Sequence, residues 1–319
     1  MSASSLTPEQ LRLVAKLAWL YYEDGLNQPE IARKLNIAQA RVSRLLKLAE
    51  EAGVVRTVVS MPRGVHIDIE RKLEAKFGLL EAVVAQGTID ADINRVLGAT
   101  AATYLDATLV SEERVGISSW SSTLLAAVES MAVKPKPAAT KLVQLLGGVG
   151  NPDAQVMATQ MASRLSKVLG AELVLVQAPG VVSSEAVRDV LLSDPSLTQA
   201  SAAWEDLTTA IVGIGTTEPS SLLVTSGNTI ASSALEELKK LGSVGDVCLH
   251  YFDSEGELVP KPNSAVVLGI APSQLRKIPR RIAIAGGEAK HEAIRAALLG
   301  SWVNVLITDD ETAKYLLKN

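Results

Sequence analysis

The 319-residue chain has few of the residues that build disulfides and metal sites. It holds one cysteine, Cys248, and three histidines, at positions 66, 250 and 291. One thiol cannot form an internal disulfide, and histidines so far apart lack the short spacings of metal-binding motifs. The composition therefore predicts no disulfide, no metal ion and no other cofactor.

Aromatic residues and long apolar runs are also scarce. Only 3% of the residues are aromatic, which argues against the base-stacking surface of single-strand-binding proteins. No apolar run reaches the roughly 18 residues that a membrane-spanning helix needs. The first ten residues, MSASSLTPEQ, lack the basic and then apolar pattern of a secretory signal. We therefore expect a cytoplasmic protein without a membrane partner.

Length and charge indicate two parts with different roles. Hydrophobic residues make up 47% of the chain, and 319 residues suit one small and one large domain. Residues 1–64 carry nine basic and six acidic side chains, whereas the remainder carries 22 and 29. A basic module joined to an acidic body is typical of a regulator whose larger part does something other than bind DNA.

The segment 27–47, NQPEIARKLNIAQARVSRLLK, has the pattern of two short helices joined by a tight turn. The first helix should begin near Pro29, because proline is favoured at the start of a helix, and should bury Ile31 and Leu35. Asn36 tolerates the left-handed conformation that such a turn requires. The second helix, expected at 39–51, should bury its apolar face and turn polar side chains outward.

These outward side chains are the types that read DNA. Arginine pairs with guanine edges, glutamine with adenine, and lysine or serine with phosphates. The candidate DNA-binding residues are Gln28, Gln39, Arg41, Ser43, Arg44 and Lys47.

Taken alone, a basic amphipathic helix pair is more often a solvated surface than a DNA-binding module. Two flanking segments favour DNA binding. An upstream helix at 11–22 would complete a three-helix core, and a β-branched strand at 54–59, after Gly53, would form a wing. We therefore predict a winged helix-turn-helix domain over residues 1–60.

The body, residues 61–319, should follow a boundary at 60–64. A charged helix is expected at 67–77, bracing the two domains or packing against a second copy. Beyond it, short apolar runs alternate with helical stretches, which is typical of an α/β domain with a largely parallel sheet covered on both faces. The eight runs are 81–85, 114–117, 142–146, 173–176, 210–214, 266–270, 281–285 and 303–307.

Four loops that follow these runs are rich in glycine and small polar residues, at 118–123, 147–151, 215–217 and 286–290. In such sheets ligands bind at the carboxyl ends of the strands, and phosphates favour helix N-termini. Each loop alone is weak evidence, because a glycine after a strand usually serves only turn geometry. Together with Lys290 they predict a pocket for a phosphorylated small molecule.

The chain as a whole resembles the SorC/DeoR-type bacterial transcriptional regulators, which respond to sugars. The resemblance implies an N-terminal helix-turn-helix, and a Rossmann-like α/β effector domain of the ribose-5-phosphate isomerase and glucosamine-6-phosphate deaminase type. It further implies a homotetramer and control of a carbohydrate or polyol catabolic operon by binding to operator DNA. The matching segments are 31–46, 144–148, 212–215, 242–246, 252–253, 285–290 and 305–309.

The same resemblance places the effector in the C-terminal domain, with its hydroxyl groups at Asp246. Where the family commonly has Trp-Gly, this chain has Trp120-Ser121, and Leu146 precedes the glycine pair where a polar or basic residue is common. Both differences weaken the case for a doubly charged phosphate, so a sugar, a polyol and a sugar phosphate stay open. The implied effector-binding residues are Ser122, Thr123, Gly147, Gly148, Gly215, Asp246 and Lys290.

Three residues have plainer interpretations. An aspartate after a glycine, such as Asp246, often only forms a turn, and Asp253 in the sequence DSEG is typical of a hairpin turn. Ala38 stands where a capping serine is usual, which should cost helix 39–51 roughly 1 kcal/mol.

The alternative function is a sugar-phosphate isomerase or deaminase-like enzyme with an appended helical module. Asp246 as general base and Lys290 as electrophile would supply the chemistry of isomerisation. Such an enzyme has no use for a basic winged module, however, and no histidine or paired carboxylate can be placed at the pocket. We therefore expect no catalytic residues.

Overall fold

The computed structural model describes residues 7–55, 66–86, 92–134, 136–260 and 266–319. The chain divides into two compact units, residues 1–62 and 63–319. The boundary expected after residue 60 falls within 56–65, outside the described residues.

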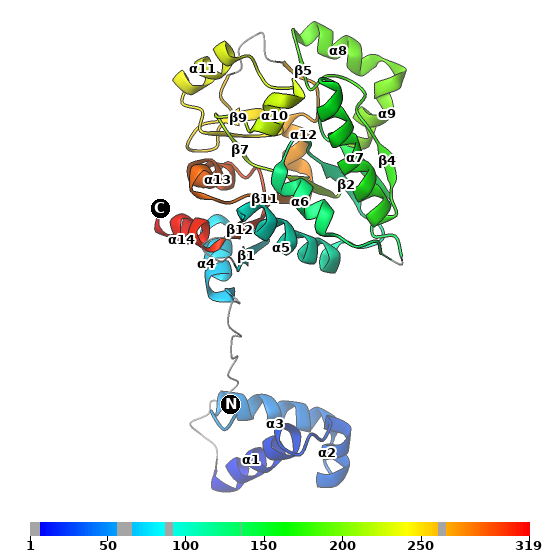
Figure 1. Cartoon of the computed structure of the whole chain (residues 1–319). Helices are drawn as coiled ribbons and strands as arrows, with labels where there is room; N and C mark the ends of the chain where they lie inside the picture. Colours follow the sequence, from blue (N-terminus) through cyan, green and yellow to red (C-terminus); the bar gives the residue numbers. More distant parts are fainter. Residues whose placement is uncertain (1–6, 56–65, 87–91, 135, 261–265) are drawn as a thin grey trace. The chain divides into compact units, whose positions relative to one another are not determined.

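The described part of the first unit consists of three helices, and its central turn is the one that the sequence predicts (Figure 1). Asn36 ends the second helix in the left-handed conformation, with φ 52° and ψ 49°. Leu17, Ile31 and Val42, one from each helix, meet in a shared core and are fully buried. The helices are α1 (Pro8–Tyr22), α2 (Gln28–Leu35) and α3 (Gln39–Glu51).

The start of α2 is held by a reciprocal cap, whereas the start of α3 is not. The Asn27 side chain accepts a hydrogen bond from the Glu30 N–H at 3.0 Å, and Glu30 accepts from the Asn27 N–H at 2.8 Å. Ala38 offers α3 no side-chain cap, as expected. Gly53 follows α3 with φ 70°. Val54 and Val55 are not in a strand, and the rest of the expected wing lies outside the described residues.

A seven-stranded sheet with every strand parallel forms the centre of the second unit. Seven of the eight predicted apolar runs contribute a strand to this sheet. The prediction is wrong for the run 266–270, because β10 (Val266–Val267) pairs antiparallel with β5 (Val181–Val182) outside this sheet. The order across the sheet is β1 (Glu81–Ala85), β12 (Val305–Asp309), β11 (Arg280–Ile284), β6 (Thr209–Val212), β2 (Arg114–Ile117), β3 (Lys141–Gln144) and β4 (Glu172–Val174).

Helices cover both faces of the sheet (Figure 1). In β11, Ile282 and Ile284 enter one core cluster and Ala283 enters the other, so neither face is left to solvent. The first cluster contains residues of α5 (Ile93–Thr108), α6 (Ser122–Ser130) and α7 (Pro152–Leu169). The second contains residues of α4 (Ile67–Phe77), α9 (Pro195–Trp204), α13 (His291–Leu299) and α14 (Asp310–Lys318).

Shorter elements complete the unit. A small antiparallel sheet joins β7 (Gly215–Thr216), β8 (Gly245–Val247) and β9 (His250–Phe252), and a 3₁₀ helix, η2, spans Glu288–Lys290. None of the helices in the described ranges is both long enough and apolar enough to cross a membrane. The remaining helices are α8 (Glu185–Ser193), α10 (Ser221–Ser226), α11 (Ser232–Lys240) and α12 (Pro272–Lys277).

Helix α4 belongs to the body of the second unit. Its Glu70 and Glu74 carboxylates accept hydrogen bonds from the Val84 and Ala82 N–H groups of β1, at 2.9 and 3.1 Å. Because β1 is an edge strand, these bonds occupy donors that the sheet leaves unpaired. Lys76 donates to the carbonyl oxygen of Leu316 in α14 at 3.0 Å.

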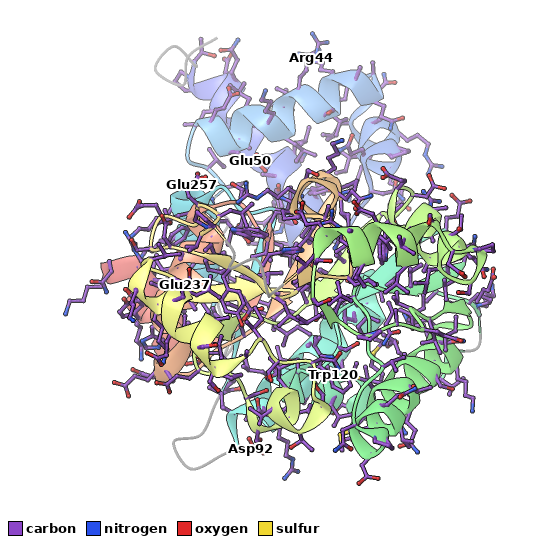
Figure 2. The ribbon with its side chains drawn as sticks, turned by 90° about the horizontal axis from the view of Figure 1, so that it is seen from above. Arg44, Glu50, Asp92, Trp120, Glu237 and Glu257 are labelled. Atoms are coloured by element: carbon purple, nitrogen blue, oxygen red, sulfur yellow. The ribbon has the colours of Figure 1, made fainter. Side chains whose placement is uncertain are left out.

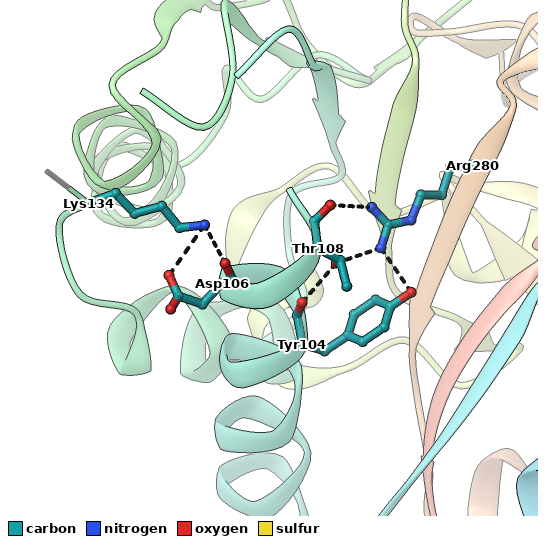
Figure 3. A network of polar contacts seen from close by, with 5 residues as sticks. All are labelled: Tyr104, Asp106, Thr108, Lys134 and Arg280. Carbon is teal, nitrogen blue, oxygen red and sulfur yellow. Dashed lines mark hydrogen bonds and ion pairs between the residues drawn. The ribbon is translucent and has the colours of Figure 1, made fainter. Parts of the chain in front are cut away.

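Arg280, the first residue of β11, bonds this strand to the C-terminal end of α5 (Figure 3). Its guanidinium donates to the Tyr104 hydroxyl at 2.8 Å and to the Thr108 hydroxyl and carbonyl oxygens at 2.6 and 3.3 Å. Its central carbon also lies 5.2 Å from the centre of the Tyr104 ring.

We expect Arg280→Met to lower the free energy of unfolding by about 2 to 3 kcal/mol, because hydrogen bonds from a charged donor to half-buried acceptors are lost. Urea denaturation gives this value. Lys134→Met is the comparison: it removes one hydrogen bond, to the Asp106 carbonyl oxygen, and an ion pair of 3.4 Å with the exposed Asp106 carboxylate, so it should cost about 1 kcal/mol. Equal losses for both variants would contradict the prediction.

Candidate functional site

Five of the six predicted DNA-binding residues lie on the solvent-exposed side of α3. Gln39, Arg41, Ser43, Arg44 and Lys47 are all exposed, and Gln28 is half-buried at the start of α2. Arg44 points away from the body of its helix (Figure 2), and its Nε donates to the Ala40 carbonyl oxygen at 3.3 Å. No acidic residue lies in the first turn of α3, so this surface suits a polyanion.

A second candidate site lies in the second unit, at the carboxyl edge of the parallel sheet. It is a cavity of about 110 Å³ bounded by the loops after β2, β6 and β11 and by the β8–β9 hairpin. Of the predicted effector-binding residues, it brings together Ser122, Gly215, Asp246 and Lys290. Its charged lining residues, among the described ones, are Lys290, Asp246 and Glu218, and no described lining residue is a histidine.

Asp246 both faces the cavity and supports the hairpin beside it. Its Oδ2 accepts a hydrogen bond from the Leu249 N–H at 2.8 Å. This bond spans a tight turn in which Cys248 and Leu249 have φ values of 52° and 61°, a conformation that costs free energy for residues other than glycine. The turn interpretation of Asp246 is therefore confirmed, and the same side chain also lines the pocket.

Gly215 lets Asp246 reach this position. The two residues are paired across β7 and β8, and a Cβ on Gly215 would lie 2.1 Å from Oδ1 of Asp246. A side chain at position 215 would force the carboxylate to move, so the close packing of this carboxylate depends on glycine.

Lys290 ends η2 and supplies the cation. Burial lowers the pKa of Lys290, whereas the negative charge of Asp246 raises it. The loop that carries Lys290 is fixed by a hydrogen bond from the Gly287 N–H to Asp309 Oδ2 at 2.9 Å. The cavity therefore holds a hydrogen-bond acceptor, Asp246, and a charged donor, Lys290, that interact electrostatically.

Three other predicted effector-binding residues do not line this cavity. The Thr123 hydroxyl donates to Asn94 Oδ1 at 2.7 Å, and the Gly147 N–H donates to the Leu268 carbonyl oxygen at 2.9 Å. A Cβ on Gly147 would lie 2.3 Å from the carbonyl oxygen of Pro179, so close chain packing explains this glycine. Gly148 is buried near Gln144.

The turn interpretation of Asp253 is confirmed, because its Oδ1 accepts from two N–H groups of its own turn.

The structure adds lining residues that the sequence did not single out. Ser118 and Ser119 are 5% and 9% exposed and lie in the loop after β2, which the sequence had marked only as a small polar segment. Trp120 (Figure 2) follows them with φ 67°, and its indole Nε1 has no hydrogen-bond partner in the described chain. Glu218 also lines the cavity, and nothing in the sequence marked it. The described residues contain no cluster of side chains that could hold a metal ion.

We expect Gly215→Ala to lower the free energy of unfolding by about 1 to 3 kcal/mol, because the new methyl group would displace the Asp246 carboxylate. Gly213→Ala is the control, since its Cβ would lie 3.0 Å from Ser121 Oγ. Thermal denaturation compares the two variants. A Gly215→Ala variant as stable as Gly213→Ala would contradict the close packing that we describe.

Comparison with known proteins identifies relatives of both units. A family model described as "Putative sugar-binding domain" matches residues 64–318, and a MarR family model matches residues 4–60. These matches confirm the predicted fold class, a winged helix-turn-helix-like domain followed by a sugar-binding α/β domain.

Relatives match over nearly the whole chain. The sorbitol operon regulator of Klebsiella pneumoniae is 31% identical over 316 residues, covering 97% of this chain and 99% of the relative. The crystal structure of this regulator, SorC, matches with a TM-score of 0.72, 30% identity and the same coverage. The transcriptional regulator LsrR of Escherichia coli K12 is 30% identical over 96% of this chain and 94% of its own. The sugar-binding domain of the regulator DeoR from Pseudomonas syringae is 34% identical, covers 80% of this chain and 100% of its own, and has a TM-score of 0.62.

Proposed function

The chain belongs to the SorC/DeoR-type family of transcriptional regulators, and we propose that an effector bound beside Asp246 and Lys290 controls its affinity for operator DNA. Its relatives are named as regulators of transcription. The chain is accordingly a DNA-binding transcriptional regulator with a sugar-binding domain and not an enzyme, so the isomerase interpretation of Asp246 and Lys290 is set aside.

The observation that carries the proposal is the pairing of one acceptor and one cationic donor in a cavity lined by serine hydroxyls. A carboxylate accepts hydrogen bonds from two neighbouring hydroxyl groups of a sugar or polyol. Lys290, with Ser122 at the N-terminus of α6, suits either a hydroxyl or an anionic end of the ligand. The effector class is therefore a sugar, a polyol or a sugar phosphate. Sorbitol and sorbitol 6-phosphate are the first pair to test, because one relative regulates a sorbitol operon.

We further propose a homotetramer that acts in the cytoplasm, where operon DNA lies. The family resemblance supports four subunits, and sedimentation equilibrium with and without ligand measures their number. The regulated genes, on the same grounds, encode carbohydrate or polyol catabolism.

Arg44→Ala should remove about 1 to 3 kcal/mol of discrimination between operator and random DNA, because a lost guanine contact affects only the specific site. Lys47→Ala should instead weaken binding to both DNAs alike and reduce the salt dependence of the affinity. Fluorescence anisotropy with labelled operator and random duplexes measures both effects. Equal losses on the two DNAs for Arg44→Ala would show that Arg44 contacts the backbone.

Asp246→Asn should weaken effector binding by about tenfold or more, because hydrogen bonds to a charged carboxylate are stronger than hydrogen bonds to a neutral amide oxygen. The amide oxygen can still accept from the Leu249 N–H, so DNA binding without effector should be unchanged. Titration calorimetry and anisotropy measure these two affinities. Asp253→Asn is the control, since Asp253 serves only its own turn. An Asp246→Asn variant that keeps its full effector response would place the ligand elsewhere.

A further inference from the structure

Gln144 does not line the cavity, but it bonds to Ser119, which does. It is the last residue of β3 and is 4% exposed. Its Oε1 accepts a hydrogen bond from the Val176 N–H at 3.0 Å, and its Nε2 donates to Ser119 Oγ at 3.1 Å. Its main-chain oxygen accepts from Trp204 Nε1 at 2.8 Å. Gln144 thus joins the loop after β2 to the segment after β4 and to α9.

These bonds determine which group donates and which accepts between Val176, Gln144 and Ser119. A backbone N–H can only donate, so the amide oxygen of Gln144 must face Val176. The Nε2 group then faces Ser119 and can also only donate, so Ser119 Oγ must accept. Because a serine hydroxyl carries a single proton, that proton is left for a partner other than Gln144.

The neighbouring hydroxyl has the same polarity. Ser118 Oγ accepts from the Gly213 N–H at 3.3 Å, so its proton also remains to be donated. Both serines are at least nine-tenths buried and line the cavity. Adjacent donors at one wall favour an acceptor oxygen of the ligand there, whereas Asp246 requires ligand hydroxyls that donate.

We propose that Gln144 is a positioning residue for effector recognition: it makes Ser119 a hydrogen-bond donor to an acceptor oxygen of the effector. This inference rests on the proposed function of the cavity. It assigns a binding role to a residue that does not touch the ligand, and it predicts that the two residues act as a unit.

A double-mutant cycle tests the proposal, with sorbitol and sorbitol 6-phosphate as probes in titration calorimetry. Gln144→Met keeps the side-chain length but removes both the donor to Ser119 and the acceptor for the Val176 N–H, and Ser119→Ala removes the hydroxyl. Each variant should weaken binding of the tighter probe by about 3- to 10-fold. If Gln144 acts through Ser119, the double variant should bind the probe no more weakly than the single variant with the lower affinity. Losses that multiply in the double variant would overturn the proposal.

Gln144→Glu gives a second test if Gln144→Met does not fold. A carboxylate keeps an acceptor for the Val176 N–H but turns the Ser119 proton away from the ligand. At alkaline pH, where the Glu carboxylate is ionised, Gln144→Glu should weaken binding of the tighter probe by about 3- to 10-fold relative to the wild-type protein at the same pH. Wild-type affinity in this variant would overturn the proposal.

Thr209→Val is the matched control. Thr209 is fully buried at the start of β6, far along the strand from the cavity, and donates a hydrogen bond to Glu113 at 2.8 Å. Its loss should lower stability without changing the affinity for the probe. If neither these two probes nor any other sugar, polyol or sugar phosphate binds the wild-type protein, the proposed function fails and this inference with it. If a probe binds and the Gln144 variants bind it normally, only the inference fails.

Discussion

Burial of both faces of the parallel sheet leaves the ends of its strands as the places where polar side chains can gather. In β11, Ile282, Ala283 and Ile284 enter opposite core clusters in alternation, so the buried part of this strand presents no polar side chain to either face. Polar side chains then gather where the strands end. The loops after β2, β6 and β11 all leave at their carboxyl ends because the three strands are parallel.

The acidic half of the pocket comes from outside this sheet. Asp246 lies on β8, which pairs antiparallel with β7, and β7 follows the end of β6 by two residues. The glycine at position 215 leaves the space that the carboxylate of its cross-strand partner Asp246 occupies. The hairpin that follows contains two residues in the left-handed conformation, and the hydrogen bond from Leu249 to Asp246 offsets part of that strain. One carboxylate thus stabilises the loop geometry and supplies the acceptor of the site.

Local patterns predicted the local structure well. Helix 39–51 and the left-handed turn at Asn36 followed from apolar spacing and from the tolerance of asparagine for that turn. Periodicity reports burial and not the identity of the partner, however, so the run at 266–270 was placed in the wrong sheet. Loop composition likewise located the edge of the sheet that carries the cavity but not which groups are available there. The hydroxyl of Thr123 and the N–H of Gly147 are bonded within the protein.

Gln144 shows why part of the site cannot be predicted from the sequence. It stands within an apolar run, where a single amide gives no periodic signal, and its role depends on three segments that are distant in sequence. The donor direction of Ser119 is a property of that network. A pattern of residue types shows that a serine is present but not whether its hydroxyl proton is already donated to another group of the protein.

An effector changes DNA affinity only through a difference in its binding free energy between DNA-competent and incompetent forms. Helix α4 directly follows residues 56–65, which connect the two units, and Glu70, Glu74 and Lys76 bond it to β1 and α14. β1 pairs with β12, and β12 pairs with β11, whose following loop carries Lys290. Parallel strands buried on both faces resist sliding past one another, because a shift would break every bond of the ladder and repack both cores. If an effector binds at Lys290 as we propose, its signal therefore reaches α4 as movement of a whole layer. We then expect the two forms to differ in how the subunits of the proposed tetramer are arranged and not within the sheet.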